Sequence, residues 1–253
     1  MSRFKLLGLT WLLITPISTL RAQETPVDAS FLLESESPPS PKAIRVLVDY
    51  GGSLGVSSLL SAIDRIGPEE RRIVAESFRG SHAEQERVFD ALFRLAQDEA
   101  APVREAAIDS LWRSKSIGGG LTLLRLIDAG YPDREALAKA VHRFAYRRRQ
   151  EEVSGAGDFE EHAVRSLEPL LTDSSTPVRY ETVQALSYFS HPRAEDLLLS
   201  VIDDSDANTR YNALLRVLPV ERFLEPLLSH ARSISEPETR RELLYDIGYA
   251  HCG

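Results

Sequence analysis

The sequence predicts an all-α protein that forms an α-α superhelix, a solenoid of about six to seven helix pairs. Three observations support this fold class. Apolar residues recur at helical spacing, a charged motif opens several of these stretches, and the motif recurs about every 30 residues. One helix pair of this size cannot bury enough apolar surface to fold alone, so neighbouring pairs must share a core.

The composition is typical of a globular, acidic protein. Of the 253 residues, 43% are hydrophobic and 27% are charged, and the formal net charge is -8 at pH 7. An acidic chain does not accumulate around phosphates, so no nucleic-acid partner is expected. The single cysteine, Cys252, cannot form an internal disulfide or a cysteine-based metal site, although an oxidising compartment would permit an intermolecular disulfide.

Residues 1–22 have the order of a secretory signal peptide. Arg3 and Lys5 precede the apolar run Leu6–Ile14, and small and polar residues follow up to Ala22, after which cleavage is expected. The run is too short to span a hydrocarbon core of about 30 Å, and an uncleaved anchor is the alternative. We therefore expect an exported protein, periplasmic or extracellular, with no stable membrane insertion after cleavage.

Residues 23–42 are predicted to be a flexible spacer, rich in proline and serine, ahead of a repeat domain over 43–253. The segment 34–41 alone holds three prolines and two glutamates, and it has little apolar surface to bury. Residues 43–64 form the expected N-terminal cap of the repeats, in which Ile44 and Leu47 fit one face of a helix. The run Val46–Val48 would also suit a strand, so the choice between helix and strand over 43–56 stays open.

An Asp-x5-Arg motif marks the first helix of the following repeats. Its four occurrences are Asp98/Arg104, Asp128/Arg134, Asp173/Arg179 and Asp204/Arg210. In three of them a proline lies two residues before the arginine, which suits the first turn of a helix. Apolar residues follow at offsets of 4 and 7 from each arginine, on one face of a helix. Arg240 continues the series without an aspartate at position 234.

The spacing of these arginines predicts the repeat length. Successive gaps are 30, 45, 31 and 30 residues, and the long gap indicates an insertion of about half a repeat that contains Arg147–Glu152 and Gly155–Gly157. Leucine-rich second helices are predicted between the first ones. They cover residues 121–127, 163–171, 194–202 and 222–228.

These repeats resemble the HEAT repeat family, which has an armadillo-type fold. The resemblance is carried by Pro102–Arg104 and Pro177–Arg179, each with an aspartate six residues before the arginine, and it covers roughly residues 57–250. The pitch is close to that of the short HEAT-like repeats of phycobilisome lyases. In this family the aspartates and arginines form a ladder between neighbouring repeats. The resemblance therefore implies that the four motif pairs are structural rather than catalytic.

Two motifs suggest chemistry that their context does not support. Gly51–Gly55 matches the nucleophile-elbow pattern G-x-S-x-G around Ser53, but an α/β hydrolase needs several parallel strands, so a turn between two cap helices is expected. Asp204–Asn208 resembles the start of a calcium loop, yet Thr209 and Leu215 stand where an EF-hand needs glycine and glutamate. Helix capping is the expected role of these acids.

The remaining candidates are equally weak. Gly118–Gly120 lacks the lysine of a phosphate-binding loop and is expected to be a turn between helices. The six histidines are scattered without a zinc-binding pattern. No residue is predicted to be catalytic, to bind a cofactor or to ligate a metal.

The function that this sequence favours is that of an exported scaffold or adaptor for protein–protein interaction, without catalysis of its own. Its partner is expected on a concave face lined by the second helices. One alternative is a serine hydrolase that uses Ser53, and another is lyase-like handling of a bilin, which export opposes because those lyases act in the cytoplasm or stroma. A HEAT-like DNA glycosylase is opposed by the negative charge. The partner's identity and the oligomeric state are left open.

Overall fold

The computed structural model describes residues 40–50, 52–79, 85–151, 156–218 and 221–252. Within these ranges the regular structure is helical, and no strand is found. The predicted signal peptide, most of the spacer, Gly51 and residues 152–155 of the insertion lie outside the described residues. None of the helices in the described ranges is long and apolar enough to cross a membrane.

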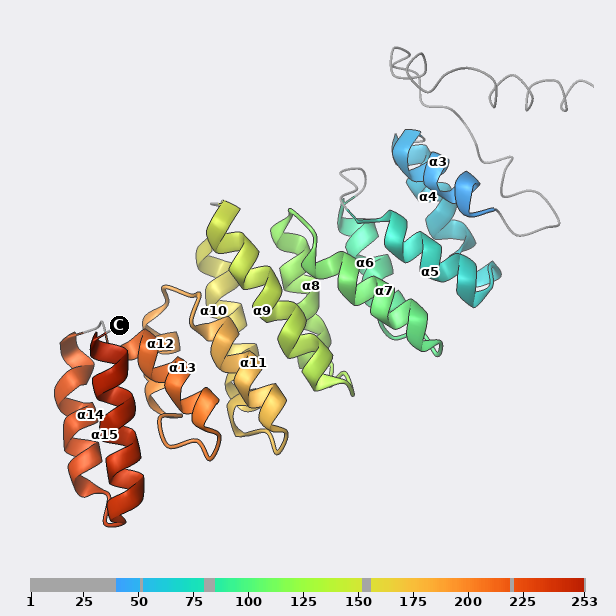
Figure 1. Ribbon diagram of the computed structural model, residues 1–253. Coiled ribbons are helices and arrows are strands. Elements are labelled where there is room, and N and C mark those ends of the chain that lie inside the picture. The colour runs from blue at the N-terminus through green and yellow to red at the C-terminus, as the bar shows by residue number, and fades with distance from the viewer. Residues whose placement is uncertain (1–39, 51, 80–84, 152–155, 219–220, 253) are drawn as a thin grey trace, which may run out of the picture.

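The helices alternate along the chain between two rows, as Figure 1 shows. The first row consists of α3 (Pro41–Tyr50), α5 (Pro68–Ser77), α7 (Ala101–Trp112), α9 (Arg134–Glu151), α11 (Thr176–Leu186), α13 (Ala207–Val217) and α15 (Pro237–Cys252). The second row consists of α4 (Gly52–Ala62), α6 (Gln85–Leu95), α8 (Ile117–Asp128), α10 (Ala156–Leu167), α12 (Pro192–Leu199) and α14 (Glu221–Ser233). Two short 3₁₀ helices, η2 (Ile63–Arg65) and η3 (Glu168–Thr172), follow α4 and α10.

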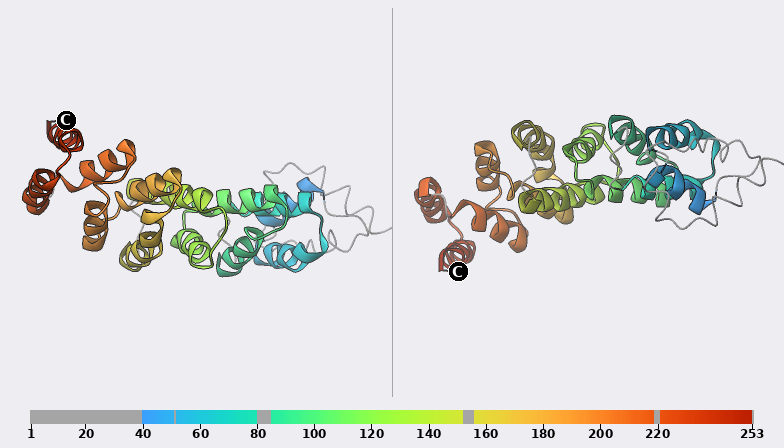
Figure 2. Two further views of the ribbon diagram at one scale, coloured as in Figure 1. Left: turned by 90° about the horizontal axis from the view of Figure 1, so that it is seen from below. Right: turned by 90° about the horizontal axis from the view of Figure 1, so that it is seen from above.

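The two rows form two layers along an elongated molecule, which the views of Figure 2 show most clearly. The described residues contain six helix pairs followed by α15, so the predicted solenoid of helix pairs is confirmed. Buried apolar side chains between the rows form one cluster that runs from Ile44 to Ile247. Each repeat contributes to it, as Leu111, Leu124 and Leu137 illustrate, because no single pair could bury its own apolar face.

The N-terminal cap is helical, which decides the open choice between helix and strand. Helix α3 begins at Pro41, two residues before the predicted boundary of the repeat domain. The Ser40 hydroxyl accepts a hydrogen bond from the Ala43 N–H at 3.3 Å, and a proline suits the first helical position. Helix α4 lies so close to α3 that a Cβ at Gly55 would be 2.1 Å from the carbonyl oxygen of Leu47. Residues 52–55 of the G-x-S-x-G motif therefore form the first turn of α4 rather than the expected turn between two cap helices, and Gly55 serves helix packing.

The insertion between the second and third motifs lengthens a first-row helix. Helix α9 has 18 residues, against 12 in α7, and the basic run Arg147–Arg149 lies in its last turns. The Arg147 guanidinium donates a hydrogen bond at 2.6 Å to the carbonyl of Arg113, just after α7. The extension thus ties the end of α9 to the preceding repeat.

The glycine run at 118–120 corrects one expectation, because it lies in the first turn of α8 rather than between helices. The helix begins after Ser116, whose hydroxyl accepts a hydrogen bond from the Gly118 N–H at 3.3 Å. A Cβ at Gly119 would lie 2.6 Å from the carbonyl oxygen of Leu111, and one at Gly120 would lie 2.3 Å from the ring of Phe144. The glycines are required because α8 packs closely against its neighbours.

Candidate functional site

Each contact between neighbouring first-row helices is one step of the charge ladder. The arginine–aspartate pair of the ladder is present at two steps, from α5 to α7 and from α11 to α13. Arg71 donates from Nε and Nη2 to the two carboxylate oxygens of Asp98 in the next repeat, at 2.7 and 3.1 Å. Its Nη1 donates at 2.9 Å to the carbonyl of Ile66. Arg179 binds Asp204 through the same two nitrogens at 2.6 and 2.9 Å. Such two-point pairs fix orientation as well as charge, so they set the register of neighbouring repeats.

The aspartates of these steps are also held by their own backbone. Asp98 accepts the Ala100 N–H at 2.9 Å, and Asp204 accepts the Asp206 N–H at 2.8 Å. Burial raises the pKa of both carboxyls, but the hydrogen bonds from arginine and backbone outweigh it, so each pKa lies below its usual value. These acids are ionised and engaged, which makes them structural parts of the repeat.

The motif pair Asp128/Arg134 does not form this arrangement, because helix α9 begins three residues later relative to the motif. The N-cap of α9 is Asp133, whose carboxylate accepts the Ala136 N–H at 2.9 Å. Asp128 ends α8 and contacts His162 at 3.0 Å, whereas Arg134 opens α9 and pairs with Asp173 at 2.6 Å. The sequence motif at Asp128/Arg134 therefore does not mark the ladder position of α9, which lies three residues further along the chain.

The position of each residue relative to the N-cap shows which residues of α9 stand where other repeats have the ladder aspartate and arginine. In α7, α11 and α13 the aspartate lies two residues before the N-cap, and the arginine lies four residues after it. The corresponding positions of α9 are Tyr131 and Leu137. Arg104, the ladder arginine of α7, is thus followed by a tyrosine in place of an aspartate.

Arg104 keeps the anchoring of a ladder arginine without the carboxylate. Its Nη1 donates to the carbonyls of Asp98 and Glu99, both at 2.8 Å. Tyr131 is only 8% exposed, and burial raises the pKa of its phenol, while a side-chain hydrogen bond with Arg104 opposes that rise. In the described part of the chain, Arg104 forms no ion pair with a carboxylate.

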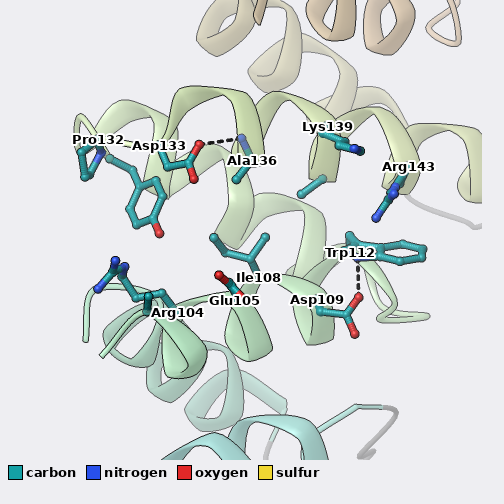
Figure 3. Close-up of a pocket in the computed structure, with 13 residues that line it drawn as sticks. Arg104, Glu105, Ile108, Asp109, Trp112, Pro132, Asp133, Ala136, Lys139 and Arg143 are labelled. Atoms are coloured by element: carbon teal, nitrogen blue, oxygen red, sulfur yellow. Dashed lines mark hydrogen bonds between the residues drawn. The ribbon is translucent and has the colours of Figure 1, made fainter. Parts of the chain in front are cut away.

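A groove of about 720 Å³ opens at this step, between α7 and α9 (Figure 3). Arg104 lies near one end of the groove, and Trp112 and Arg143 face each other near the other end. Ile108 and the alanines of both helices provide an apolar lining between them. Arg104 and Tyr131 also line a second groove, of about 430 Å³, toward the end of α8.

The charges in the main groove are unequally engaged. The Asp109 carboxylate accepts hydrogen bonds from Trp112 Nε1 and from Arg113, both at 2.9 Å. The Trp112 ring lies between two guanidinium groups, with Cζ of Arg113 at 4.4 Å and Cζ of Arg143 at 5.3 Å from its centroid. Among the described residues, Lys139 and Arg143 have no carboxylate partner. The α9 side of the groove therefore offers positive charge.

Helix α9 carries an unusual charge for this protein. It holds six lysines and arginines and two glutamates, in a chain whose formal net charge is -8. Arg148 is engaged by Glu160 at 2.9 Å, and Arg134 by Asp173, but both partners lie away from the groove. A local basic surface thus lies within an acidic protein.

The second row is linked by acid–base pairs that are more exposed than the complete ladder pairs of the first row. In each pair the acid belongs to the earlier repeat and the base to the later one. The pairs are Asp64–Arg94, Asp90–Arg125, Asp128–His162, Glu168–Arg193 and Asp203–His230, at distances from 2.6 to 3.0 Å. They are not evident from the sequence, because their members lie 25 to 35 residues apart and share no local motif.

Exposed apolar side chains collect on the first row instead. Within the described ranges, the large hydrophobic residues that are exposed are Tyr146 on α9, Leu215 on α13, and Leu244 and Tyr245 on α15. Tyr245 also lines a third groove, between α13 and α15, where Ile234 occupies the ladder position of the aspartate. These three grooves thus lie at steps where the ladder aspartate is replaced.

The other candidate residues from the sequence lie in helices, at helix caps or in side-chain pairs between helices. Ser53 is the second residue of α4 and follows a helix rather than a strand, so the setting of a nucleophile elbow is missing there. Asp206 caps α13 by accepting the Thr209 N–H at 2.8 Å, as expected for the calcium-like segment. His142 contacts Glu181 at 2.6 Å. The described part of the chain holds no group of three or more metal-ligating side chains.

Comparisons with known proteins identify the repeats. Residues 164–245 match the family model of HEAT repeats, and no curated protein matches the chain. The fold is similar to a designed armadillo repeat protein in complex with the peptide (KR)4, at 16% identity and a TM-score of 0.46, covering 89% of this chain and 100% of that one. It is also similar to the complex of CpcE and CpcF of phycocyanin lyase from Nostoc sp. PCC7120, at 22% identity and a TM-score of 0.42, covering 89% and 87%. The family match thus confirms HEAT-like repeats over residues 164–245.

Proposed function

We propose that this chain of HEAT-like repeats is an exported, non-enzymatic scaffold that binds a partner protein on the first-row face. The groove between α7 and α9 is the observation that carries the proposal. Its volume of about 720 Å³ falls within the range of roughly 300–1,000 Å³ typical of ligand sites. Six of its thirteen lining residues are charged, and the other seven include Ile108, Trp112 and Tyr131, so it offers both charged and apolar contacts to a partner.

The contrast between the rows supports the choice of face. The sequence favours the second helices as the partner site, but acid–base pairs occupy the charges that link those helices. Two grooves lie between first-row helices, and the exposed large hydrophobic side chains of the described ranges are also on this row, Tyr245 being 69% exposed. Exposed aromatic and cationic groups are typical of interaction surfaces.

The groove chemistry favours binding over catalysis. Its lining includes no serine, threonine, cysteine or histidine, so it lacks the hydroxyl–imidazole or thiol–imidazole pair of serine and cysteine hydrolases. Asp109 and Asp133 are both engaged in hydrogen bonds that serve the fold. The arrangement suits recognition of a partner through Arg104, Trp112 and Arg143.

Site-specific photo-crosslinking tests which row contacts the partner. A photoreactive amino acid would replace Lys139 in the groove or, as the matched control, the exposed Glu161 on α10 of the second row. We expect the same partner protein to be recovered from position 139 and not from position 161. Adducts from position 161 alone, or from neither position across growth conditions, would contradict the proposal.

The export part of the proposal rests on the signal-peptide pattern of residues 1–22. Expression of the full sequence with its native N-terminus tests it through the intact mass of the protein recovered outside the cytoplasm. A mass that corresponds to a start at Gln23 supports export with cleavage. A full-length mass found only in the cytoplasm would rule it out.

A further inference from the structure

We infer that the groove between α7 and α9 recognises an acidic segment of the partner, with a partner carboxylate bound to the guanidinium of Arg104. The inference rests on the proposed function, since it assumes that the first-row face binds a protein. It starts from a comparison within the molecule. The arginine of the same repeat position holds a carboxylate at two other steps, in Arg71–Asp98 and Arg179–Asp204.

The orientation of Arg104 is fixed in the same way as that of the other two arginines. In all three, Nη1 donates to backbone carbonyls that precede the helix, at 2.8 to 2.9 Å. In Arg71 and Arg179 this anchoring leaves Nε and Nη2 to bind both oxygens of the next aspartate. Arg104 instead forms a side-chain hydrogen bond with the phenol of Tyr131, so its guanidinium meets a neutral group where the other two arginines meet a carboxylate of the next repeat. Among the described residues its positive charge has no carboxylate partner, which leaves it able to attract one from a ligand. A planar guanidinium fits both oxygens of a carboxylate, which a lysine cannot do.

Tyr131 adds a donor at this point. It occupies the ladder position of the aspartate and lines both grooves beside Arg104. A phenol with the ordinary pKa of about 10 is protonated at neutral pH, and burial raises this pKa further, so the hydroxyl can donate to a carboxylate oxygen. The tyrosine at this position thus places a hydroxyl donor where other repeats have a carboxylate acceptor.

The far end of the groove provides a second site for negative charge. Lys139 and Arg143 lie one turn apart on α9, and both line the groove without a carboxylate partner among the described residues. Trp112 lies beside Arg143, and Ile108 lies between this end and Arg104 (Figure 3). The complementary ligand is an extended segment with carboxylates at both ends of an apolar or aromatic side chain.

Three acids and three cations line the groove, and Glu105 is the acid that opposes an acidic ligand most directly. In the described part of the chain it has no hydrogen bond or ion pair, whereas Asp109 and Asp133 are engaged. Its charge therefore repels an incoming carboxylate. Replacement of this glutamate by glutamine is expected to strengthen the binding of an acidic peptide several-fold.

Fluorescence anisotropy with labelled octapeptides tests the inference at low ionic strength, where charge contacts are strongest. The probes are (ED)4, its neutral counterpart (QN)4 and the basic (KR)4. We expect (ED)4 to bind at least tenfold more tightly than the other two. Arg104→Gln should weaken (ED)4 at least tenfold, whereas Arg125→Gln, which removes an exposed cation of the second row, should leave the affinity unchanged.

Tyr131→Asp gives a second, independent outcome. An aspartate at this position would pair with Arg104 as Asp98 pairs with Arg71, so the folded variant, checked by circular dichroism, should lose (ED)4 binding. Equal binding of the three peptides, or unchanged (ED)4 affinity in Arg104→Gln, would overturn the inference. The crosslink from position 139 does not depend on peptide charge. If it persists in that case, the scaffold stands and acid recognition alone fails.

Discussion

At the residue scale, one arginine position has two environments in this molecule. Arg71 and Arg179 are closed by aspartates of the next repeat, and the side chain of Asp204 is only 6% exposed in its pair. Arg104 has the same backbone anchoring and a tyrosine beside it. The same side chain therefore fixes the repeat register at some steps and faces a groove at another.

The closed steps should contribute measurably to stability. Asp98→Asn and Asp204→Asn each remove a charged hydrogen-bond acceptor from a mostly buried pair, which should lower the free energy of unfolding by about 1.5–3 kcal/mol. Asp90→Asn in the exposed pair with Arg125 is the control, with an expected loss below about 1 kcal/mol. Urea unfolding followed by circular dichroism measures all three. Equal losses in the buried and exposed pairs would contradict the structural role of the ladder.

The same carboxyls predict a pH dependence. Their folded pKa values lie below the usual value, so their contribution is present above the unfolded pKa of about 3.9 and is lost as the pH falls through the folded pKa. The stability difference between the wild-type protein and Asp204→Asn should thus be full at pH 7 and shrink below about pH 4. Urea midpoints at pH 7, 4 and 3 measure it. A difference that stays constant to pH 3 would count against an ionised, paired Asp204.

The limits of sequence-based prediction are visible in the same residues. The repeat, the helix pairs and the ladder at Arg179–Asp204 follow from motif spacing, because the motif and the helix start coincide there. At Asp128/Arg134 the motif is present but the helix begins in a different register, which only the capping by Asp133 reveals. The groove was not predictable, since it depends on which residue comes to lie opposite Arg104.

At the element scale, glycines set how closely the helices approach. The run at 118–120 permits α8 to contact neighbouring helices where a Cβ would clash, as at Gly119 against the carbonyl of Leu111. Glycine is otherwise unfavourable inside a helix. Where a Cβ would clash with a neighbour, a helical glycine is required for packing; where a Cβ would have room, the glycine only lowers helix stability and can be replaced. A Cβ at Gly248 in α15 would have no other atom within 4 Å, which makes this glycine an example of the second case.

Two glycine-to-alanine substitutions should therefore have opposite effects. Gly119→Ala forces a Cβ against backbone and should destabilise the protein by about 1–3 kcal/mol. Gly248→Ala adds helix propensity in open space and should stabilise it by about 0.5–1 kcal/mol. Thermal unfolding followed by circular dichroism compares the two variants. Stabilisation by Gly119→Ala would show that α8 does not pack closely against its neighbours.

At the scale of the whole molecule, the two rows of helices have different surfaces. Both contribute to one continuous core, but exposed acid–base pairs link the second row, and the first row carries grooves and exposed aromatic side chains. A basic helix, α9, lies within an acidic chain and forms one wall of the main groove. This asymmetry is the basis for placing the partner on the first row.

Tryptophan fluorescence tests that placement most directly. The sequence contains two tryptophans, Trp11 and Trp112, so a protein that starts at Gln23 keeps only the one that lines the groove. Titration with the partner recovered from the position-139 crosslink, with Trp112→Phe as the blank, should change the Trp112 emission in a saturable way. The same titration of Arg104→Gln should require higher partner concentrations. Binding detected by calorimetry without any change in Trp112 emission would contradict the claim that the groove between α7 and α9 is the partner site.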